Sequence, residues 1–340
     1  MIWQFIDSSS VGGAERHIAT LAEGLRRRGH SASVLLLEDH GDNPWLVQLT
    51  AADIAYTYLD GRFATLLEAL RTQRPRLLHT HGYKAGIMGR IAARLARVPV
   101  VSTFHSGERG QFPVSVYDAV DDWTSFLGQR IAVSAQIGER LPFGAHLIPS
   151  YVTTSDAPPV MPLPAVAAFV GRLSFEKGPD LFCELAERAS ADPQFADIEW
   201  HVWGDGAMRE GLVAEHGLRV NFHGVATDME AVWRRVGLLV MPSRSEGVPL
   251  AALEAAARGI PVLASRVGGL PAVVEDGRTG WLFECANLVD GMGGLQNWQT
   301  VRQGSSVAMR RACWEKARDD FSEARWLPEV MAVYTEAGWN

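Results

Sequence analysis

The chain has 340 residues, 47% of them hydrophobic and 21% charged, a composition typical of a soluble globular protein with room for two domains. Its formal net charge of −7 at pH 7 argues against a nucleic-acid binder, and no apolar run reaches the roughly 18 residues of a membrane span. The three cysteines are far apart and form no metal-site pattern, and the early acidic Asp7 does not fit a signal peptide. We therefore expect a cytoplasmic protein with reduced thiols.

Apolar strands alternate with helices along residues 1–152. The predicted strands are Ile2–Ile6, Ser33–Leu37, Leu77–Thr80, Val98–Thr103, Arg130–Val133 and His146–Ile148. Helices are expected between them, for example at Ala14–Arg28 and Lys84–Arg97. This alternation predicts a parallel, doubly wound sheet. A polar, proline-rich segment at 153–164 interrupts the pattern and is interpreted as an interdomain linker.

A second α/β set occupies residues 165–318. Its predicted strands are Ala165–Val170, Ile198–Trp203, Val220–Phe222, Gly237–Met241, Pro261–Ala264 and Gly280–Phe283. Gly224 and Val225 follow the third of these strands, and nucleotides bind at strand ends in open α/β sheets. Residues 287–306 are polar and glycine-rich, with weak periodicity.

The first loop of the chain carries two adjacent glycines. Gly12 and Gly13 stand after the strand Ile2–Ile6 and before an amphipathic helix. Because glycine has no side chain, the backbone can approach a ligand closely at this helix N-terminus. The pattern is not the G-x-G-x-x-G dinucleotide fingerprint, and a plain tight turn is the alternative interpretation.

The loop after the strand Ala165–Val170 carries two cations. Arg172 is followed five residues later by Lys177, across a turn that ends in Gly178. Arginine offers a planar fork and lysine a mobile point charge, so the pair can bind one diphosphate. Two ordinary solvated charges are the alternative.

A pair of glutamates marks the run that follows the strand Gly237–Met241. That run contains Glu246, Gly247, Val248, Pro249, Leu250 and Glu254. A proline suits the first turn of a helix, where free N–H groups and the helix dipole can bind a phosphate. Glu254 can then accept a hydrogen bond from a ribose hydroxyl, while Glu246 faces the group attached to the phosphates. Outside this strand, turn and helix, the same spacing would indicate only a surface helix.

These three loops together resemble those of the retaining glycosyltransferases of family 4, which have the GT-B fold. The resemblance is most specific in residues 171–178 and 246–254, the second of which matches the family's E-x7-E module. It implies two Rossmann-like, doubly wound domains that face a central cleft. Residues 1–152 would form the acceptor-side domain and 165–318 the nucleotide-sugar-binding domain. A helix in 319–340 would cross back to the N-terminal domain.

The resemblance also implies roles for single residues. The catalytic residues would be His105, Glu246, Arg172 and Lys177. His81 would line the acceptor side with His105, although a structural role is the alternative for both histidines. The donor-binding residues would be Gly12, Gly13, Arg172, Lys177, Gly224, Val225, Glu246, Gly247, Val248, Pro249, Leu250 and Glu254. His79 and His81 share a strand face without a third ligand, so we expect no metal site there.

The implied reaction moves a sugar from a nucleotide-diphosphate sugar, such as a UDP- or GDP-sugar, to a glycan, lipid-linked or small-molecule acceptor. Negative charge develops on the leaving diphosphate, and Arg172, Lys177 and the helix N-terminus would stabilise it. No Asp-x-Asp triplet occurs in the sequence. We therefore expect metal-independent hexosyl or N-acetylhexosaminyl transfer with no cofactor. The family suggests bacterial surface polysaccharide or lipopolysaccharide assembly as the setting.

Arginines cluster in the N-terminal half, at 26–28, 71–76 and 90–97. Each cluster fits a solvated helix face, or a surface that contacts anionic lipid at the inner face of the membrane, where each basic group adds about 1 kcal/mol.

Two other functions fit the same fold. A nucleotide-sugar epimerase of GT-B architecture would form an isomer from the donor alone. A non-catalytic nucleotide-sugar-binding protein would bind the donor without turnover.

Overall fold

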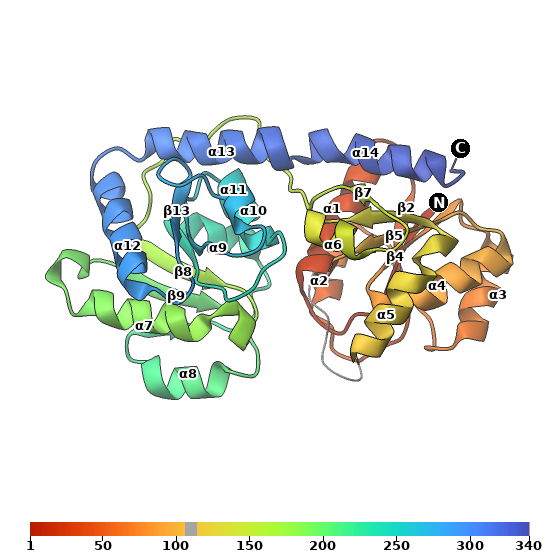
Figure 1. Cartoon of the computed structure of the whole chain (residues 1–340), viewed down its shortest axis with the longest axis horizontal. Helices are drawn as coiled ribbons and strands as arrows, with labels where there is room; N and C mark the ends of the chain where they lie inside the picture. Colours follow the sequence, from red (N-terminus) through yellow and green to blue (C-terminus); the bar gives the residue numbers. More distant parts are fainter. Residues whose placement is uncertain (106–113, 340) are drawn as a thin grey trace. The chain divides into compact units, whose positions relative to one another are not determined.

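The computed structural model describes residues 1–105 and 114–339, which form two compact units (Figure 1). The first unit comprises Met1–Tyr151 and Glu323–Asn340, and the second comprises Val152–Ser322. Each unit is built on one parallel sheet with helices on both faces, which confirms the predicted α/β class with two doubly wound sheets. Among the residues described, no helix is both long and apolar enough to cross a membrane.

The first unit holds a sheet with strand order β3-β2-β1-β4-β5-β6-β7. Its strands are β1 (Ile2–Ile6), β2 (Ala32–Leu36), β3 (Tyr56–Tyr58), β4 (Leu77–His81), β5 (Val100–Phe104), β6 (Gln129–Ala132) and β7 (His146–Leu147). Its helices are α1 (Gly13–Arg27), α2 (Trp45–Ala51), α3 (Phe63–Gln73), α4 (Tyr83–Ala96), α5 (Val114–Thr124), α6 (Ala135–Arg140) and α14 (Glu323–Glu336).

Strand β1 shows how this sheet divides the core of the first unit. Successive side chains of a strand point to opposite faces. Ile2 and Ile6 pack with α1 and α14 on one face, whereas Trp3 and Phe5 pack with α3 and α4 on the other. Gln4 has the same alternation as Ile2 and Ile6, so this polar side chain lies on the α1 and α14 face.

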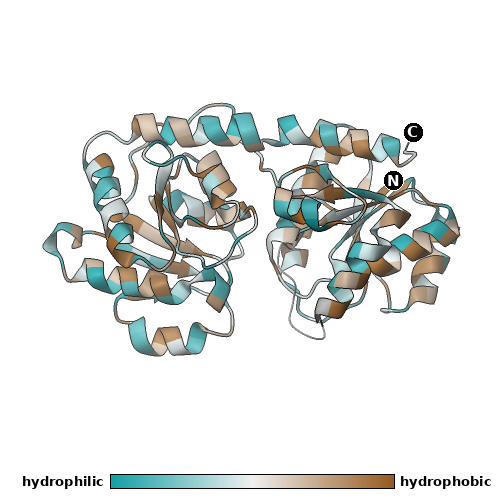
Figure 2. Ribbon diagram, viewed as in Figure 1, coloured by the Kyte–Doolittle hydropathy of each residue, from teal (hydrophilic) through white to brown (hydrophobic). Residues whose placement is uncertain are grey.

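The second unit holds a sheet with strand order β10-β9-β8-β11-β12-β13. Its strands are β8 (Val166–Val170), β9 (Glu199–Trp203), β10 (Val220–Phe222), β11 (Leu238–Met241), β12 (Val262–Ser265) and β13 (Gly280–Phe283). Its helices are α7 (Pro179–Ser190), α8 (Arg209–His216), α9 (Met229–Arg235), α10 (Leu250–Ala257), α11 (Leu270–Val273), α12 (Leu288–Gln303) and α13 (Val307–Phe321). Figure 2 shows hydrophobic residues along the strands of both sheets, while hydrophobic and hydrophilic residues alternate along the helices.

Two segments differ from the sequence-based expectation, and the predicted linker has a contact that the sequence did not indicate. The short strand β3 was not predicted, and the glycine-rich residues 287–306 contain the helix α12. The side chain of Asn287 caps this helix, and Gly294 lets it approach the sheet, because a Cβ there would overlap the side chain of Leu263. The proline-rich segment 153–164 is bound to α13, since Arg310 donates to the carbonyl of Met161 at 2.8 Å.

Gly204 sets the distance between the end of β9 and the loop that carries Arg172. Its φ is +147°, which favours glycine, and a Cβ there would overlap the carbonyl oxygen of Gly171. The amide of Gly171 donates to the Trp203 carbonyl at 3.0 Å, so the two strand ends are also hydrogen-bonded. Close backbone contact therefore fixes the start of this loop.

We predict that Gly204→Ala lowers the free energy of unfolding of the second unit by more than about 2 kcal/mol, because the methyl group forces the strand ends apart. The matched control is Gly211→Ala, at a helical position where a Cβ meets nothing within 4 Å. That control should raise stability by about 0.5–1 kcal/mol. Urea titrations of the three proteins measure the difference, and equal midpoints for Gly204→Ala and wild type would contradict the close approach.

Candidate functional site

The predicted donor loops lie at the switch point of the second sheet. Strands β8 and β11 pair in parallel, but the chain continues from them to opposite sides of the sheet. Open α/β sheets bind ligands at this point, beyond the carboxyl ends of the strands. One loop is 171–178, with Arg172 and Lys177, and the other is 242–249, with Glu246. The topology therefore places side by side two motifs that are about 70 residues apart in sequence.

A short ion pair joins the two loops. Lys177 Nζ lies 2.6 Å from Oε2 of Glu246, and Ser243 Oγ donates to Oε1 of the same carboxylate at 2.9 Å. The Glu246 side chain is 2% exposed, whereas that of Lys177 is 32% exposed. Because an ammonium group has three donors, Lys177 can hold Glu246 and still donate to a phosphate oxygen. Ser243 stands in the same turn, but its sequence pattern alone does not indicate this hydrogen bond.

A second, bidentate ion pair clamps the same two loops. Arg244 donates to both carboxylate oxygens of Asp180, at 2.8 and 2.5 Å, and to the carbonyl of Phe175 at 2.8 Å. The guanidinium also lies over the Phe175 ring, 4.0 Å from its centre. The hydrogen bond to Asp180 raises the pKa of Arg244, so the pair is stabilised in its charged form. The sequence offered no sign of this clamp beyond the position of Arg244 within the motif.

The N-terminus of α10 offers backbone donors rather than side chains. Pro249 is the extended N-cap residue and Leu250 begins the helix, so the expectation that the proline lies in the first helical turn is corrected by one residue. Val248 and Leu250 pack their side chains against the hydrophobic core. In the part of the chain that the structure describes, the amides of Gly247, Val248 and Leu250 donate to no backbone carbonyl. Together with the helix dipole, they can bind an anion.

Glu254 lies in the second turn of α10 and is half-buried. Trp233 Nε1 donates to its Oε2 at 3.2 Å, which fixes the orientation of the carboxylate. This contact keeps the carboxylate where it can accept from a further donor such as a ribose hydroxyl. Trp233 is a supporting residue that the motif alone does not reveal, because it comes from α9.

Arg172 is the exposed cation of the donor loops. Within residues 1–105 and 114–339, its guanidinium has no hydrogen-bonded or ion-paired partner, so the structure does not bring it into contact with Glu246. Its charge nevertheless helps to lower the pKa of Glu176. Burial raises the pKa of Glu176, but the hydrogen bond from Ser174 and the charges of Lys177 and Arg172 outweigh burial and lower it overall.

Gly224 and Val225 lie at the carboxyl end of the edge strand β10. The Gly224 carbonyl accepts from the amide of Gly204 at 2.8 Å, which ties the ends of β10 and β9 together. Val225 is 49% exposed, so its side chain is accessible at this edge. Both predicted donor contacts therefore lie at the same end of the sheet as the two loops, but beyond β9 from Lys177.

The glycine loop of the first unit also lies at a switch point, because β1 pairs with both β2 and β4. Gly12 is the N-cap residue of α1, and Gly13 begins the helix. Ser8 Oγ donates to Oε1 of Glu15 at 2.8 Å, so the loop is held against the first turn of α1. The predicted strand, loop and helix all form.

His105 and His81 contact each other inside the first unit. His105 Nε2 lies 3.0 Å from Nδ1 of His81, and the other nitrogen of His81 lies 2.9 Å from Oε1 of Gln4. His81 is only 1% exposed, and both of its nitrogens are engaged. The expectation that His81 lines the acceptor side is therefore revised: it supports His105 from behind. His105 is half-buried at the end of β5.

Buried histidines surround this pair. His17 of α1 packs its ring edge-on against His105, with ring centroids 5.0 Å apart, and burial lowers the pKa of His17 to about 4. Burial also lowers the pKa of His79, His81 and His105 well below the usual histidine range. These rings are therefore neutral near pH 7. Among the described residues, no three His, Cys, Asp or Glu side chains are arranged to hold a metal ion.

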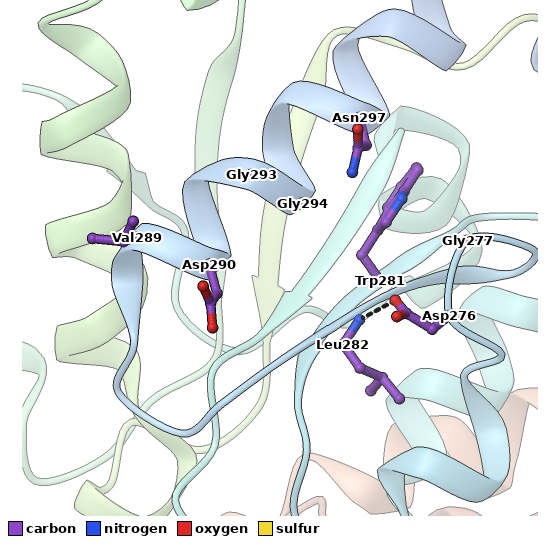
Figure 3. Close-up of a pocket in the computed structure, with 9 residues that line it drawn as sticks. All are labelled: Asp276, Gly277, Trp281, Leu282, Val289, Asp290, Gly293, Gly294 and Asn297. Atoms are coloured by element: carbon purple, nitrogen blue, oxygen red, sulfur yellow. Dashed lines mark hydrogen bonds between the residues drawn. The ribbon is translucent and has the colours of Figure 1, made fainter.

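A separate cavity of about 460 Å³ lies between β13 and α12 (Figure 3). It is lined by Asp276, Gly277, Trp281, Leu282, Val289, Asp290, Gly293, Gly294 and Asn297. Both of its carboxylates are already engaged, because Asp276 accepts from the amide of Leu282 at 2.9 Å and Asp290 accepts from Nδ2 of Asn287 at 2.7 Å. Asp276 and Gly277 precede β13, so this cavity reaches the amino end of the strand, whereas the two predicted donor loops follow the carboxyl ends of β8 and β11.

The chain is similar to known glycosyltransferases. UDP-Gal:alpha-D-GlcNAc-diphosphoundecaprenol alpha-1,3-galactosyltransferase of Escherichia coli is 28% identical over 305 residues, which cover 80% of this chain and 78% of that protein. D-inositol 3-phosphate glycosyltransferase of Mycobacterium sp. (strain KMS) is 26% identical, covering 97% of this chain and 86% of that protein. The crystal structure of Anabaena HepE in complex with UDP-glucose superposes with a TM-score of 0.80 at 18% identity, covering 99% of this chain and 100% of that chain.

Two family models match the chain, one in each unit. Glycosyltransferase Family 4 matches residues 11–142, and Glycosyl transferases group 1 matches residues 164–295. The first match includes the glycine loop and His105, and the second includes both donor loops. This chain therefore belongs to glycosyltransferase family 4 and has the GT-B fold.

Proposed function

We propose that this glycosyltransferase moves a hexosyl or N-acetylhexosaminyl group from a UDP-sugar to a glycan or lipid-linked acceptor, with retention of configuration and without a metal ion. The observation that carries the proposal is the cluster at the β8–β11 switch point. There Lys177 and Glu246 form a 2.6 Å ion pair. The backbone amides of Gly247, Val248 and Leu250, which donate to no backbone carbonyl among the described residues, follow Glu246 directly at the start of α10. A cation and a helix N-terminus at one point suit a diphosphate, and the adjacent carboxylate suits the sugar that it carries.

The chemistry follows from where charge develops. The bond between the anomeric carbon and the diphosphate breaks, a bond from that carbon to the acceptor oxygen forms, and the acceptor proton passes to a phosphate oxygen. Lys177, Arg172 and the α10 amides stabilise the departing diphosphate. Attack from the face that the diphosphate leaves gives retention. Glu246 and His105 orient the sugar, and Glu254 binds the ribose.

Metal independence is supported by the donor set. Two cationic side chains and a helix N-terminus supply positive charge where another glycosyltransferase would use a divalent ion with an Asp-x-Asp motif, which this sequence lacks. The exposed guanidinium of Arg172 is available for a second phosphate contact.

The relatives support the choice of donor and setting. The Escherichia coli relative is named for UDP-galactose and a diphosphoundecaprenol acceptor, and the HepE structure contains UDP-glucose. Another solved structure with the same fold is the lipopolysaccharide outer core galactosyltransferase WaaB. We propose assembly of a bacterial surface glycan as the setting, in the cytoplasm at the inner face of the membrane.

Contact with that membrane is supported by an exposed apolar face on the first unit. Helix α5 and the turn after it expose Val116, Tyr117, Val120, Trp123 and Phe126 by 40–66% each. Phe126 lines a cavity together with Arg94, Arg97 and Arg130. Aromatic side chains beside arginines suit an interface with anionic lipid, where the rings enter the headgroup region and the guanidinium groups stay at the surface.

We predict that UDP at 100 times its Kd stabilises the second unit by about 2.7 kcal/mol, measured as an upward shift of its thermal midpoint. Glu254→Ala should weaken this stabilisation while leaving kcat at saturating donor within about twofold, because the ribose contact is equal in ground and transition states. An unchanged donor KM with a collapsed kcat would contradict the ribose role. Isomer formation from the donor alone would identify an epimerase instead.

We predict that activity survives excess EDTA and that Lys177→Ala lowers kcat by about 10²–10³-fold even with added Mg²⁺, because one positioned donor to the leaving group is lost. Lys177→Arg should recover only part of the rate, since a planar fork does not replace a compact ammonium. The control is Lys316→Ala. Lys316 lies on α13, where it forms ion pairs with Glu275 and Asp320, and its loss should leave activity unchanged. Loss of activity on chelation, restored by a divalent ion, would overturn metal independence.

We predict that the protein sediments with phosphatidylglycerol vesicles and not with phosphatidylcholine vesicles, and that Trp123→Ser reduces the bound fraction several-fold. Leu218→Ser is the matched control, because Leu218 is fully exposed on the second unit and lies outside the apolar face. Equal sedimentation of both variants and the wild type would show that α5 does not bind lipid.

A further inference from the structure

A chain of buried hydrogen bonds connects His105 to the last helix of the protein. His105 Nε2 meets Nδ1 of His81 at 3.0 Å, and His81 Nε2 meets Oε1 of Gln4 at 2.9 Å. The other end of the same amide, Nε2 of Gln4, donates to the hydroxyl of Tyr334 at 3.4 Å. Tyr334 lies on α14, which packs against α1 on the same face of the sheet (Figure 1). The connection spans 330 residues of sequence.

The chain continues from Tyr334 to the sheet. The Tyr334 hydroxyl lies 2.8 Å from Nδ1 of His79, and His79 Nε2 lies 2.7 Å from Oγ1 of Thr103. Gln4, His79 and Tyr334 are all 0% exposed, so water does not satisfy their polar atoms. Each of these groups depends on the next for its hydrogen bond, because an unpaired buried polar atom is costly.

The bonds must all run in one direction. Burial lowers the pKa of each histidine, so every ring is neutral and has one N–H donor and one lone pair. An amide oxygen only accepts, so Oε1 of Gln4 requires the proton of His81 to be on Nε2. His81 Nδ1 then accepts, and the proton of His105 must be on Nε2. His105 therefore offers its other nitrogen, Nδ1, as an acceptor.

Turning the Gln4 amide over would reverse every bond. The Tyr334 hydroxyl would then donate to the amide oxygen, the amide NH₂ would donate to His81, and the proton of His105 would move to Nδ1. The site would then present a donor in place of an acceptor. The observed orientation, in which the NH₂ group of Gln4 faces Tyr334, leaves the tyrosine proton for His79.

We propose that Tyr334, Gln4 and His81 are positioning residues that keep the proton of His105 on Nε2, so that Nδ1 accepts a hydrogen bond from a hydroxyl of the bound sugar or acceptor. Among the described residues, Nδ1 of His105 has no hydrogen-bond partner. This inference rests on the proposed role of His105 in sugar transfer. It adds that the last helix of the chain, which lies behind the site, decides which kind of hydrogen bond the site offers.

The test compares two tyrosines that each lose one hydroxyl. Tyr334→Phe breaks the chain, whereas Tyr151→Phe removes a hydroxyl that is equally buried but has no hydrogen-bond partner. Both rings pack against a histidine, with centroids 5.5 Å apart in each case. The two variants therefore differ chiefly in whether the chain of hydrogen bonds from His105 through His81 and Gln4 to Tyr334 (the relay) is intact.

Nitrogen-15 NMR of histidine-labelled full-length protein reports which ring nitrogen carries the proton, with His105→Ala used to assign the His105 signals. We expect wild type and Tyr151→Phe to show a single His105 tautomer protonated on Nε2, and Tyr334→Phe to show a mixture. Wild-type His105 protonated on Nδ1, or the same tautomer in both tyrosine variants, would overturn the relay.

Kinetics separate the relay from the proposed function. We expect Tyr334→Phe to lower kcat about three- to tenfold at unchanged donor KM, because the net effect of one orienting hydrogen bond is of about that size. Tyr151→Phe should match wild type, and His105→Ala should lose more than Tyr334→Phe. If His105→Ala retains wild-type turnover while the NMR result is as expected, the role of His105 in transfer is wrong although the relay exists. If Tyr334→Phe keeps the wild-type kcat while His105→Ala loses activity, the relay does not position His105 for transfer.

Discussion

The bidentate ion pair between Arg244 and Asp180 is the interaction on which the proposed donor site of the second unit depends. It closes two loops that leave neighbouring parallel strands, and it makes one surface of segments about 70 residues apart. The Lys177–Glu246 pair is as exposed on one side as the Arg244–Asp180 pair, but it has one point of contact where Arg244 has a bidentate contact and a further hydrogen bond to the Phe175 carbonyl. Because Arg244 clamps the loops, Lys177 can hold Glu246 and still has donors for the phosphate contact that we propose. In this proposal Arg244 holds the two loops together, whereas Lys177 supplies the positive charge for the phosphate.

The sequence was sufficient for those parts of the protein whose signals are local. Both sheets, the glycine loop and the two donor loops were predicted because each combines an apolar strand with a turn and a helix start. Helix α12 was not recognised, because Gly294 suits close packing against Leu263 yet reduces helix propensity. The supporting residues were missed for a different reason. Trp233 and Tyr334 act on residues that the chain brings close only after folding, and no spacing rule reports such contacts.

His81 shows how a strand position decides between contact with a ligand and support. It ends β4 as predicted, and strand ends are where ligands bind. Its side chain nevertheless follows the alternation of the strand to the face covered by α1 and α14, where it is buried. His105, one strand along and one residue beyond the end of β5, stays half-buried. Two histidines that both lie at strand ends thus differ in burial: His81 is fully buried, and His105 is half-buried.

The first unit is discontinuous in sequence, and this affects how it can be made. Its apolar face on α1 is covered by Leu327, Val330 and Val333 of α14, all of them buried. During synthesis, residues 1–151 leave the ribosome long before α14 exists, so this face stays uncovered while the whole second unit is translated. A fragment that ends at Tyr151 would keep the same apolar surface exposed and would be prone to aggregate. The last eighteen or so residues thus complete a core that the first residues began.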